Sequence, residues 1–393
     1  MKKQLAVIMV LLMTIFIGFG IIIPVLPQVV TESGASTVHL GLLLSVYSAA
    51  SFLMSPLWGG LSDRYGRRPI IMIGLAGFSV SFFIFGISGD NLWLMYLSRV
   101  CGGLFSGAAT ACAVAYVADI TTEENRTKGM GLVGMSIGLG FIFGPAFGGI
   151  LSQWGHHVPF FASSLLALAT LFFALVMLPE SLTPEKRGKT EKQSRWSAFV
   201  GVNKYLYILS FFVSFSLAGL EATLLLFEQD KIGATPLQFG IIFAVSGVVG
   251  AAIQGGVVRR YIKKGDEQRV IAIGLLLSAA GFLLILLSSS VVTAAIYLSV
   301  FGAGNALIRP CVTSLISQKT PVGQGVASGL NSSMDSLGRI AGPLLGAAVY
   351  DSGHELPFWT GAILSIAALY LLYRFHALDR IASRVRQGAF SKN

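Results

Sequence analysis

Hydrophobic residues fall into twelve long runs separated by shorter polar segments. A helix that crosses the ~30 Å hydrocarbon layer needs roughly 20 apolar residues, so each run is long enough to span a bilayer. Because lipid offers the backbone no hydrogen-bond partner, we predict that every run is a helix. The runs lie at approximately 5–29, 38–61, 70–88, 92–117, 128–151, 159–178, 205–228, 237–258, 270–289, 291–317, 324–350 and 357–376.

The basic residues between these runs are distributed unequally. Of the 28 lysines and arginines, 24 fall in segments on the side that also holds both termini. Lys231 alone lies on the opposite side, and Arg99, Arg309 and Arg339 lie inside runs. By the positive-inside rule, the basic side and both termini face the cytoplasm.

Composition supports a multi-pass membrane protein. The 393 residues are 54% hydrophobic and only 12% charged, whereas soluble domains carry about 25% charged residues. This excludes a soluble enzyme and a disordered or nucleic-acid-binding chain. The net charge of +10 follows from topology and needs no partner beyond the lipids of the inner leaflet. We find no metal-ligand spacing and no nucleotide-binding G-x-x-x-x-G-K-[ST] pattern, so we expect no metal and no cofactor.

Two segments recur at about half the chain length. Residues 59–68 resemble 255–264, which lie 196 positions later, and 144–149 resemble 342–347, which lie 198 positions later. A chance match between Gly-rich segments is the alternative. Paired bundles around a midplane site are typical of secondary transporters. The predicted units are a six-helix bundle at 1–178, a cytoplasmic linker at 179–204, a second six-helix bundle at 205–376 and a cytoplasmic tail at 377–393.

Several motifs resemble those of a known family. The pattern Gly-x-Leu-Ser-Asp-Arg-x-Gly-Arg-Arg at 59–68 resembles the loop 2–3 signature of the major facilitator superfamily. Arg99-x-x-x-Gly103 matches its helix-4 arginine motif. In the fifth run, Gly140-x-x-x-Gly144-Pro145-x-x-Gly148-Gly149 resembles the antiporter motif, which is found chiefly in exporters.

Other segments are similar to bacterial twelve-helix drug:proton antiporters. Gly18-Phe19-Gly20 with 24–27 is similar to their opening helix, while Ile308-Arg309-Pro310 and 329–333 point to the NorA/Bmr-like multidrug exporters. The resemblance covers the whole chain. It implies an all-α protein of two pseudo-symmetric six-helix bundles, a monomer that exports amphipathic or cationic small molecules, with protons as the coupling ion. No motif specifies the substrate.

The segment at 59–68 is expected to latch the two halves in the outward-open state, as the resemblance implies. Its site residues are Gly59, Asp63, Arg64, Gly66, Arg67 and Arg68. Gly66 permits a tight turn, and the arginines favour anionic lipid headgroups. A merely positive-inside loop would explain the arginines but not an acid between glycines.

In the antiporter motif, Gly140, Gly144 and Gly148 recur every four residues and form one smooth helix face. Such a face lets another helix approach closely. Pro145 removes a backbone hydrogen bond and permits a bend, and Gly149 completes the motif. Plain small-residue packing is the alternative interpretation, and it gives these residues the same structural role.

Glu221 is the strongest candidate for proton coupling. It lies in the outer half of the seventh run with no cation beside it in sequence. An ionisable residue inside a span is costly and marks function, and burial favours the neutral form of a carboxyl. The same carboxylate would attract a cationic drug. The related exporters carry an acidic residue in this context, whereas a structural pair with an arginine of another helix is the alternative.

The eleventh run holds a second acid, Asp335, four residues before Arg339. The two share a helix face, so mutual neutralisation is one interpretation. Relatives tend to have uncharged residues here, and they place an acid three residues before the tenth-run arginine, where this chain has Ala306 beside Asn305. We hypothesise that Asp335 supplies the second acidic group.

The remaining candidates line or tune the same pocket. The resemblance associates Arg99 with proton coupling, with packing through its stem as the alternative. Arg309 lies near the inner end of the tenth run, where it can also snorkel to the cytoplasm. A polyspecific pocket needs aromatic walls, for which Phe16, Phe301 and Tyr47 are candidates. The polar residues that we expect in the same pocket are Glu221, Asn305, Arg309 and Arg339.

Two other functions remain open from the sequence. One is an exporter of a single physiological solute, such as a sugar, siderophore or lipid. The other is a membrane-embedded enzyme or receptor, although no cluster of His, Ser, Cys or carboxylates forms a catalytic constellation. The Gly-Pro motif of the fifth run favours export over import.

Overall fold

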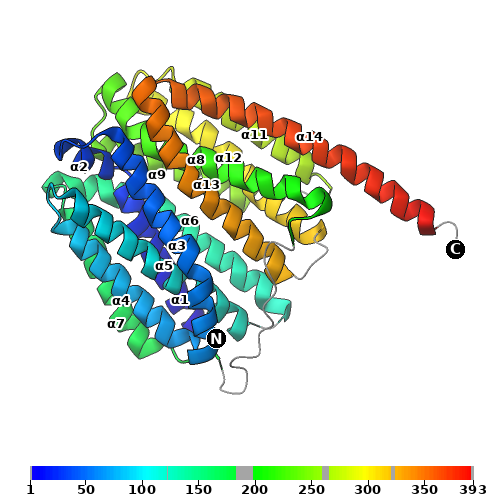
Figure 1. The fold of residues 1–393 in the computed structure, drawn as a ribbon, viewed down its shortest axis with the longest axis horizontal. Helices are drawn as coiled ribbons and strands as arrows, with labels where there is room; N and C mark the ends of the chain where they lie inside the picture. Colours follow the sequence, from blue (N-terminus) through cyan, green and yellow to red (C-terminus); the bar gives the residue numbers. More distant parts are fainter. Residues whose placement is uncertain (1, 122, 183–197, 259–264, 320–323, 391–393) are drawn as a thin grey trace.

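The computed structural model describes residues 2–121, 123–182, 198–258, 265–319 and 324–390, and these residues form helices without strands (Figure 1). The first group of long helices is α1 (Lys2–Ile22), α3 (Thr37–Tyr65), α4 (Arg67–Gly86), α5 (Leu92–Ile120), α6 (Glu123–Leu151) and α7 (Val158–Met177). The second is α8 (Lys204–Ile232), α9 (Pro236–Ala252), α11 (Glu267–Ile285), α12 (Val291–Lys319), α13 (Gln324–Ser352) and α14 (Leu356–Phe390). Most of the predicted linker, residues 183–197, lies outside the described part.

Each of the twelve predicted spans is mostly helical where the structure describes it. Eleven helices are long and apolar enough to cross a bilayer, and this confirms a multi-pass membrane fold. The remaining predicted span, the eleventh run, is α13, which has sufficient length but is more polar, with Asp335 and Arg339 near its middle. Because α13 packs between α8 and α3, its polar side chains are shielded from lipid by protein.

The largest departures from the predicted bounds are in the first and last helices. The first predicted span is interrupted after Ile22, and a short helix, α2 (Leu26–Glu32), follows. Pro24 lies in the break and has no backbone N–H to continue the ladder. At the other terminus, α14 continues to Phe390 well beyond the predicted span, and its last turns project away from the bundle in Figure 1.

The two groups repeat the same packing scheme, which confirms the predicted pseudo-symmetry. In the first half, α1 packs on α6, α4 on α5, α3 on α5 and α4 on α7. The equivalent pairs in the second half are α8 with α13, α11 with α12, α9 with α12 and α11 with α14. Between the halves, α3 packs on α13 and α6 packs on α9, again as equivalent pairs.

We call the end that holds the start of α1 and the turn between α3 and α4 the basic end, and the other end the far end. The described contacts between the halves are tightest toward the far end. Ser45 Oγ of α3 donates to the Ile340 carbonyl of α13 at 2.6 Å. A Cβ at Gly149 of α6 would lie 2.5 Å from the Pro236 carbonyl oxygen of α9. Toward the basic end the two groups of helices diverge in Figure 1.

Candidate functional site

A cavity of about 180 Å³ lies between the two halves, with mostly aromatic and hydroxyl walls. The first half supplies the aromatic side chains and the second half supplies a cation. The lining includes Phe16 and Phe19 of α1, Tyr47 of α3, Phe141 of α6 and, from α13, Ser336 and Arg339. The cavity therefore brings together three of the predicted pocket residues, Phe16, Tyr47 and Arg339.

Arg339 links the aromatic wall to Glu221. Its guanidinium carbon lies 5.1 Å from the Phe141 ring centroid and 5.6 Å from that of Phe19, and both rings belong to the other half. One guanidinium nitrogen, Nη1, lies 3.8 Å from Glu221 Oε2 of α8. Charge-assisted hydrogen bonds are shorter, about 2.7–2.9 Å, so this is a loose ion pair. Glu221 therefore has the arginine of another helix as its partner.

Asp335 has a different partner from the one its position suggests. It accepts a hydrogen bond from Ser214 Oγ of α8 at 2.8 Å, and Ser214 in turn accepts one from Arg309 Nη2 at 2.9 Å. In the described part of the chain, the pair between Asp335 and Arg339 is not formed. The Ser214 hydroxyl thus connects Asp335 to Arg309 of α12, whereas Arg339 pairs with Glu221.

Arg99 is almost fully buried among aromatic rings. Its guanidinium carbon lies 4.7 Å from the Phe85 ring centroid, 5.4 Å from Phe82 and 5.7 Å from Tyr47. No carboxylate pairs with it among the described residues. Because Tyr47 also lines the cavity, Arg99 contacts the aromatic wall from behind. Gly103 of the same motif lets α5 approach the backbone of α3 at Tyr47.

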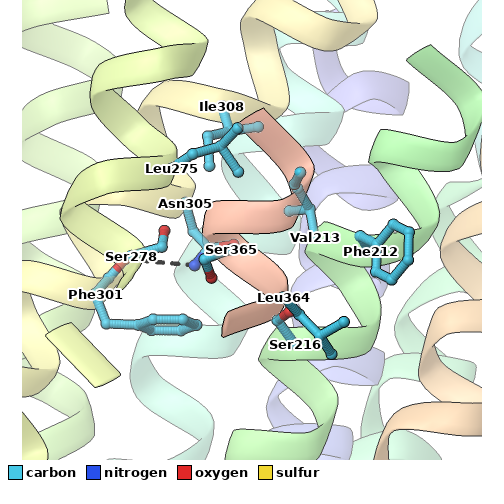
Figure 2. A pocket seen from close by; sticks show the side chains of 11 residues that line it. Phe212, Val213, Ser216, Leu275, Ser278, Phe301, Asn305, Ile308, Leu364 and Ser365 are labelled. Carbon is cyan, nitrogen blue, oxygen red and sulfur yellow. Dashed lines mark hydrogen bonds between the residues drawn. The ribbon is translucent and has the colours of Figure 1, made fainter. Parts of the chain in front are cut away.

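Of the other predicted pocket residues, Glu221 and Arg309 do not line the central cavity, and two more line a different one. Phe301 and Asn305 of α12 line a separate cavity of about 10 Å³ inside the second half, shown in Figure 2, which has room for about one water molecule. Phe301 packs edge-on against Phe282 of α11, with ring centroids 4.9 Å apart. Asn305 Nδ2 donates to the Phe301 carbonyl at 3.3 Å. Both residues therefore face helices of their own bundle and not the central cavity.

The segment at 59–68 forms an ion-pair cluster within the first half. Arg67 Nη1 lies 2.6 Å from Asp63 Oδ1, and Arg67 Nε lies 3.1 Å from Asp119 Oδ2 at the end of α5. Gly66 has φ of +107°, which favours glycine, and connects α3 to α4. Glu180 accepts hydrogen bonds from the backbone N–H groups of Arg67 and Arg68 at the start of α4.

The other members of this segment are less constrained. Arg64 lies over the exposed ring of Tyr65, and Arg68 donates to the Leu175 carbonyl at 2.7 Å. Nothing lies within 4 Å of a Cβ built on Gly59. Sequence reasoning missed Asp119 and Glu180 as partners of this segment, because they are 52 and 113 positions from Arg67.

The glycines of the antiporter motif lie against α1 and α9. Cβ atoms built on Gly140 and Gly144 would lie 2.5 Å from Phe16 Cβ and 2.7 Å from Gly20 Cα, and Gly148 is similarly close to the Ile21 carbonyl. A Cβ on Gly240 of α9 would lie 2.7 Å from the Pro145 carbonyl oxygen. One face of α6 therefore holds α1, and the other contacts the opposite half.

Two aromatic residues of the cavity were not selected as pocket residues from the sequence, Phe19 and Phe141. Phe19 lies between Gly18 and Gly20, and Phe141 directly follows Gly140, so both lie beside glycines that bring their helices together. The 198-residue offset also makes Phe141 the equivalent of Arg339, as Gly140 is of Gly338. Their proximity to a close-packed glycine face is the signal that could have found them.

Comparison with known proteins gives a consistent result. A family model described as Major Facilitator Superfamily matches residues 8–321 and 263–390. Multidrug resistance protein 2 of Bacillus subtilis is 33% identical over 390 residues, which cover 94% of this chain and 95% of that protein. Quinolone resistance protein NorA of Staphylococcus aureus strain Mu50 is 31% identical over 378 residues, covering 95% and 96%.

Solved structures share the fold. The human organic anion transporter MFSD10 (TETRAN) matches with a TM-score of 0.72 and 27% identity, covering 94% of this chain and 99% of that one. A bacterial homologue of the human lysosomal transporter Spinster matches with a TM-score of 0.77 and 14% identity, covering 96% and 97%.

Proposed function

Because the chain belongs to the major facilitator superfamily, we propose that it is an antiporter that exports amphipathic or cationic drugs from the cytoplasm in exchange for protons. The names of its relatives, a multidrug resistance protein and a quinolone resistance protein, support drug efflux. We place it in the bacterial inner membrane as a monomer whose basic loops contact anionic headgroups. A transporter needs neither a catalytic constellation nor a cofactor.

The observation that carries this proposal is the central cavity. Its aromatic and hydroxyl walls offer broad apolar contact with few fixed hydrogen bonds, which suits substrates of varied shape. The loose pair of Glu221 and Arg339 lies at its wall. Its 180 Å³ is below the about 300–1,000 Å³ of sites for drug-sized ligands, so a drug requires the halves to open further.

We infer that the basic end faces the cytoplasm and that this conformation faces inward. The positive-inside rule supports the first point, since the start of α1 and the turn between α3 and α4, both basic, lie at that end. Packing of Gly149 against Pro236 and the hydrogen bond from Ser45 to Ile340 hold the far end closed. Rocking the halves about these contacts would open the cavity to the outside.

In the proposed cycle, proton and drug compete for one carboxylate. A cationic drug entering from the cytoplasm displaces Arg339 from the ionised Glu221. On the outside, a proton binds Glu221 and forms the neutral acid, which no longer attracts the drug cation, and the unpaired Arg339 repels it. Return to the inward-facing state and release of that proton to the cytoplasm restore the carboxylate and its pair with Arg339.

Everted membrane vesicles with an imposed proton gradient test this function. We expect the lumen, acidic at the start, to become more alkaline when a cationic dye is added, because each dye ion entering exchanges for protons. A response to one sugar and to no drug would instead identify an exporter of a single physiological solute.

The same vesicles test whether Asp335 is a second proton site. We expect Asp335→Asn to weaken proton exchange, because the hydrogen bond from Ser214 then loses its anionic acceptor. Full proton-coupled efflux by Asp335→Asn, with none by Glu221→Gln, would leave Glu221 as the single coupling acid.

A further inference from the structure

We propose that Arg339 makes the transporter selective for zwitterionic aromatic substrates, which place a carboxylate on Arg339 and a cationic group on Glu221. This inference rests on the proposed function and narrows its substrate class. A substrate of this kind replaces the internal ion pair with two pairs of its own.

The charge at the cavity wall is positive. Among the described residues that line the cavity, Arg339 alone carries a charge, while the others are aromatic, aliphatic or hydroxyl side chains. The Glu221 side chain is 8% exposed and that of Arg339 is 19% exposed. A ligand in the cavity therefore meets the guanidinium before it meets the carboxylate, and a bare cation meets repulsion first.

The Arg339 guanidinium also has N–H donors that can bind a ligand. Its contact with Glu221 is a single nitrogen–oxygen approach of 3.8 Å, and no hydrogen bond from Arg339 is formed within the described part of the chain. Arginine carries five N–H donors in a planar fork that matches both oxygens of a carboxylate. Phe19 and Phe141 hold this fork against their rings, where a planar aromatic carboxylate can stack beside it.

The other two arginines inside the spans do not offer the same site. Arg309 is already hydrogen-bonded to Ser214, which links it to Asp335. Arg99 is 1% exposed, and the rings of Tyr47, Phe82 and Phe85 surround it. Only Arg339 combines a place on the cavity wall with a loosely held partner.

Charge balance selects a zwitterion over either single ion. A substrate with only an anionic group would take Arg339 and leave the buried Glu221 without a cation. A substrate with only a cationic group would take Glu221 and leave Arg339 unpaired. An unpaired buried charge is strongly destabilising, whereas a zwitterion leaves both residues paired.

A zwitterion also preserves exchange with protons. Protonated Glu221 has no negative charge with which to bind the cationic group, so a proton and the substrate still exclude each other. With a simple anion the opposite holds, because protonation of Glu221 frees Arg339 and favours anion binding. Proton-driven export is therefore consistent with a zwitterion and not with a simple anion.

Three small probes of closely similar shape test this inference in everted vesicles. They are para-(trimethylammoniomethyl)benzoate, its methyl ester, which is a permanent cation, and the anion in which carbon replaces the quaternary nitrogen. We expect wild-type kcat/KM to be about tenfold or more higher for the zwitterion than for either analogue, as loss of one hydrogen bond to a charged group predicts. Arg339→Gln is expected to lower zwitterion transport about tenfold and to abolish the preference for the zwitterion over the ester, because the repulsion of a bare cation is lost with the guanidinium.

Matched variants separate selectivity from misfolding. Arg339→Lys keeps the charge without the planar fork and should retain part of the zwitterion preference, and Arg374→Gln on the exposed face of α14 should retain all of it. Equal transport of zwitterion and ester by the wild type overturns the inference, as does transport of a dye but of none of the probes. If neither dye nor probe exchanges for protons, the proposed function itself fails.

Discussion

The two halves place different side chains at equivalent positions of one scaffold. Gly140 and Phe141 of α6 correspond to Gly338 and Arg339 of α13, and each glycine packs its helix against the first helix of its own half. The pseudo-symmetry brings the equivalent side chains together, with the Arg339 guanidinium carbon 5.1 Å from the Phe141 ring. One half thus contributes an aromatic ring and the other a cation to the same contact.

The same contrast holds on the neighbouring helices. Two residues after Gly20 of α1 comes the buried Ile22, and two residues after Gly219 of α8 comes the buried Glu221. Glycines fix the backbone spacing in both halves, whereas the positions beside them differ in chemistry. Rigid packing is therefore shared by both halves, while the carboxylates to which we assign proton exchange, Glu221 and Asp335, lie in the second half.

Removing the carboxylate of Glu221 in the second half should have the largest effect. We expect Glu221→Gln to abolish dye-driven proton exchange, because the amide cannot take part in the protonation cycle and leaves Arg339 without its anion. Luminal pH in everted vesicles reports the result. Glu355→Gln, an exposed carboxylate at the far end, is the control and should behave as wild type. Retained exchange by Glu221→Gln would remove the functional difference between the halves.

Substituting the glycines should affect both halves alike and less severely. At Gly144 and Gly342 an added methyl group meets Gly20 and the Phe215 carbonyl, so we expect Gly→Ala at either site to destabilise the protein by about 1–3 kcal/mol. Thermal unfolding in detergent measures the effect. Gly138 of α6 has open space around its Cβ position, and Gly138→Ala should be neutral or stabilising by up to about 1 kcal/mol. A large effect in one half only would contradict a shared scaffold.

Local patterns in the sequence are sufficient to predict this scaffold. Apolar runs predict the spans because lipid leaves the backbone no other partner, and glycines spaced by four predict close helix contacts. The run at 324–350 predicts α13 as well, although this helix is the most polar of the twelve spans and is not among the eleven that are apolar enough to cross a bilayer. The break after Ile22 was missed because Pro24 falls inside a run whose apolarity is continuous on both sides.

The partners of the polar residues do not follow from local patterns. Asp335 and Arg339 are four positions apart, and helical spacing favours their pairing. In the structure, Arg339 instead pairs with Glu221, and Asp335 accepts a hydrogen bond from Ser214. These partners lie on α8, more than 110 positions away. Phe301 illustrates the same limit, because composition marks it as a wall residue but only packing shows that it faces α11.

The smallest expected effect is that of substituting Phe141, the aromatic residue equivalent to Arg339. Phe141→Leu keeps an apolar side chain beside Gly140 but removes the ring under the guanidinium, a contact of about 0.5–1 kcal/mol at partly exposed sites. We expect KM for the zwitterionic probe to rise about threefold with kcat unchanged, since the ring positions Arg339 and takes no part in protonation. Phe143→Leu, on the exposed face of the same helix, is the control. A loss as large as that of Glu221→Gln would mean that the ring itself is required for proton exchange, and the division of chemistry between the halves would then be wrong.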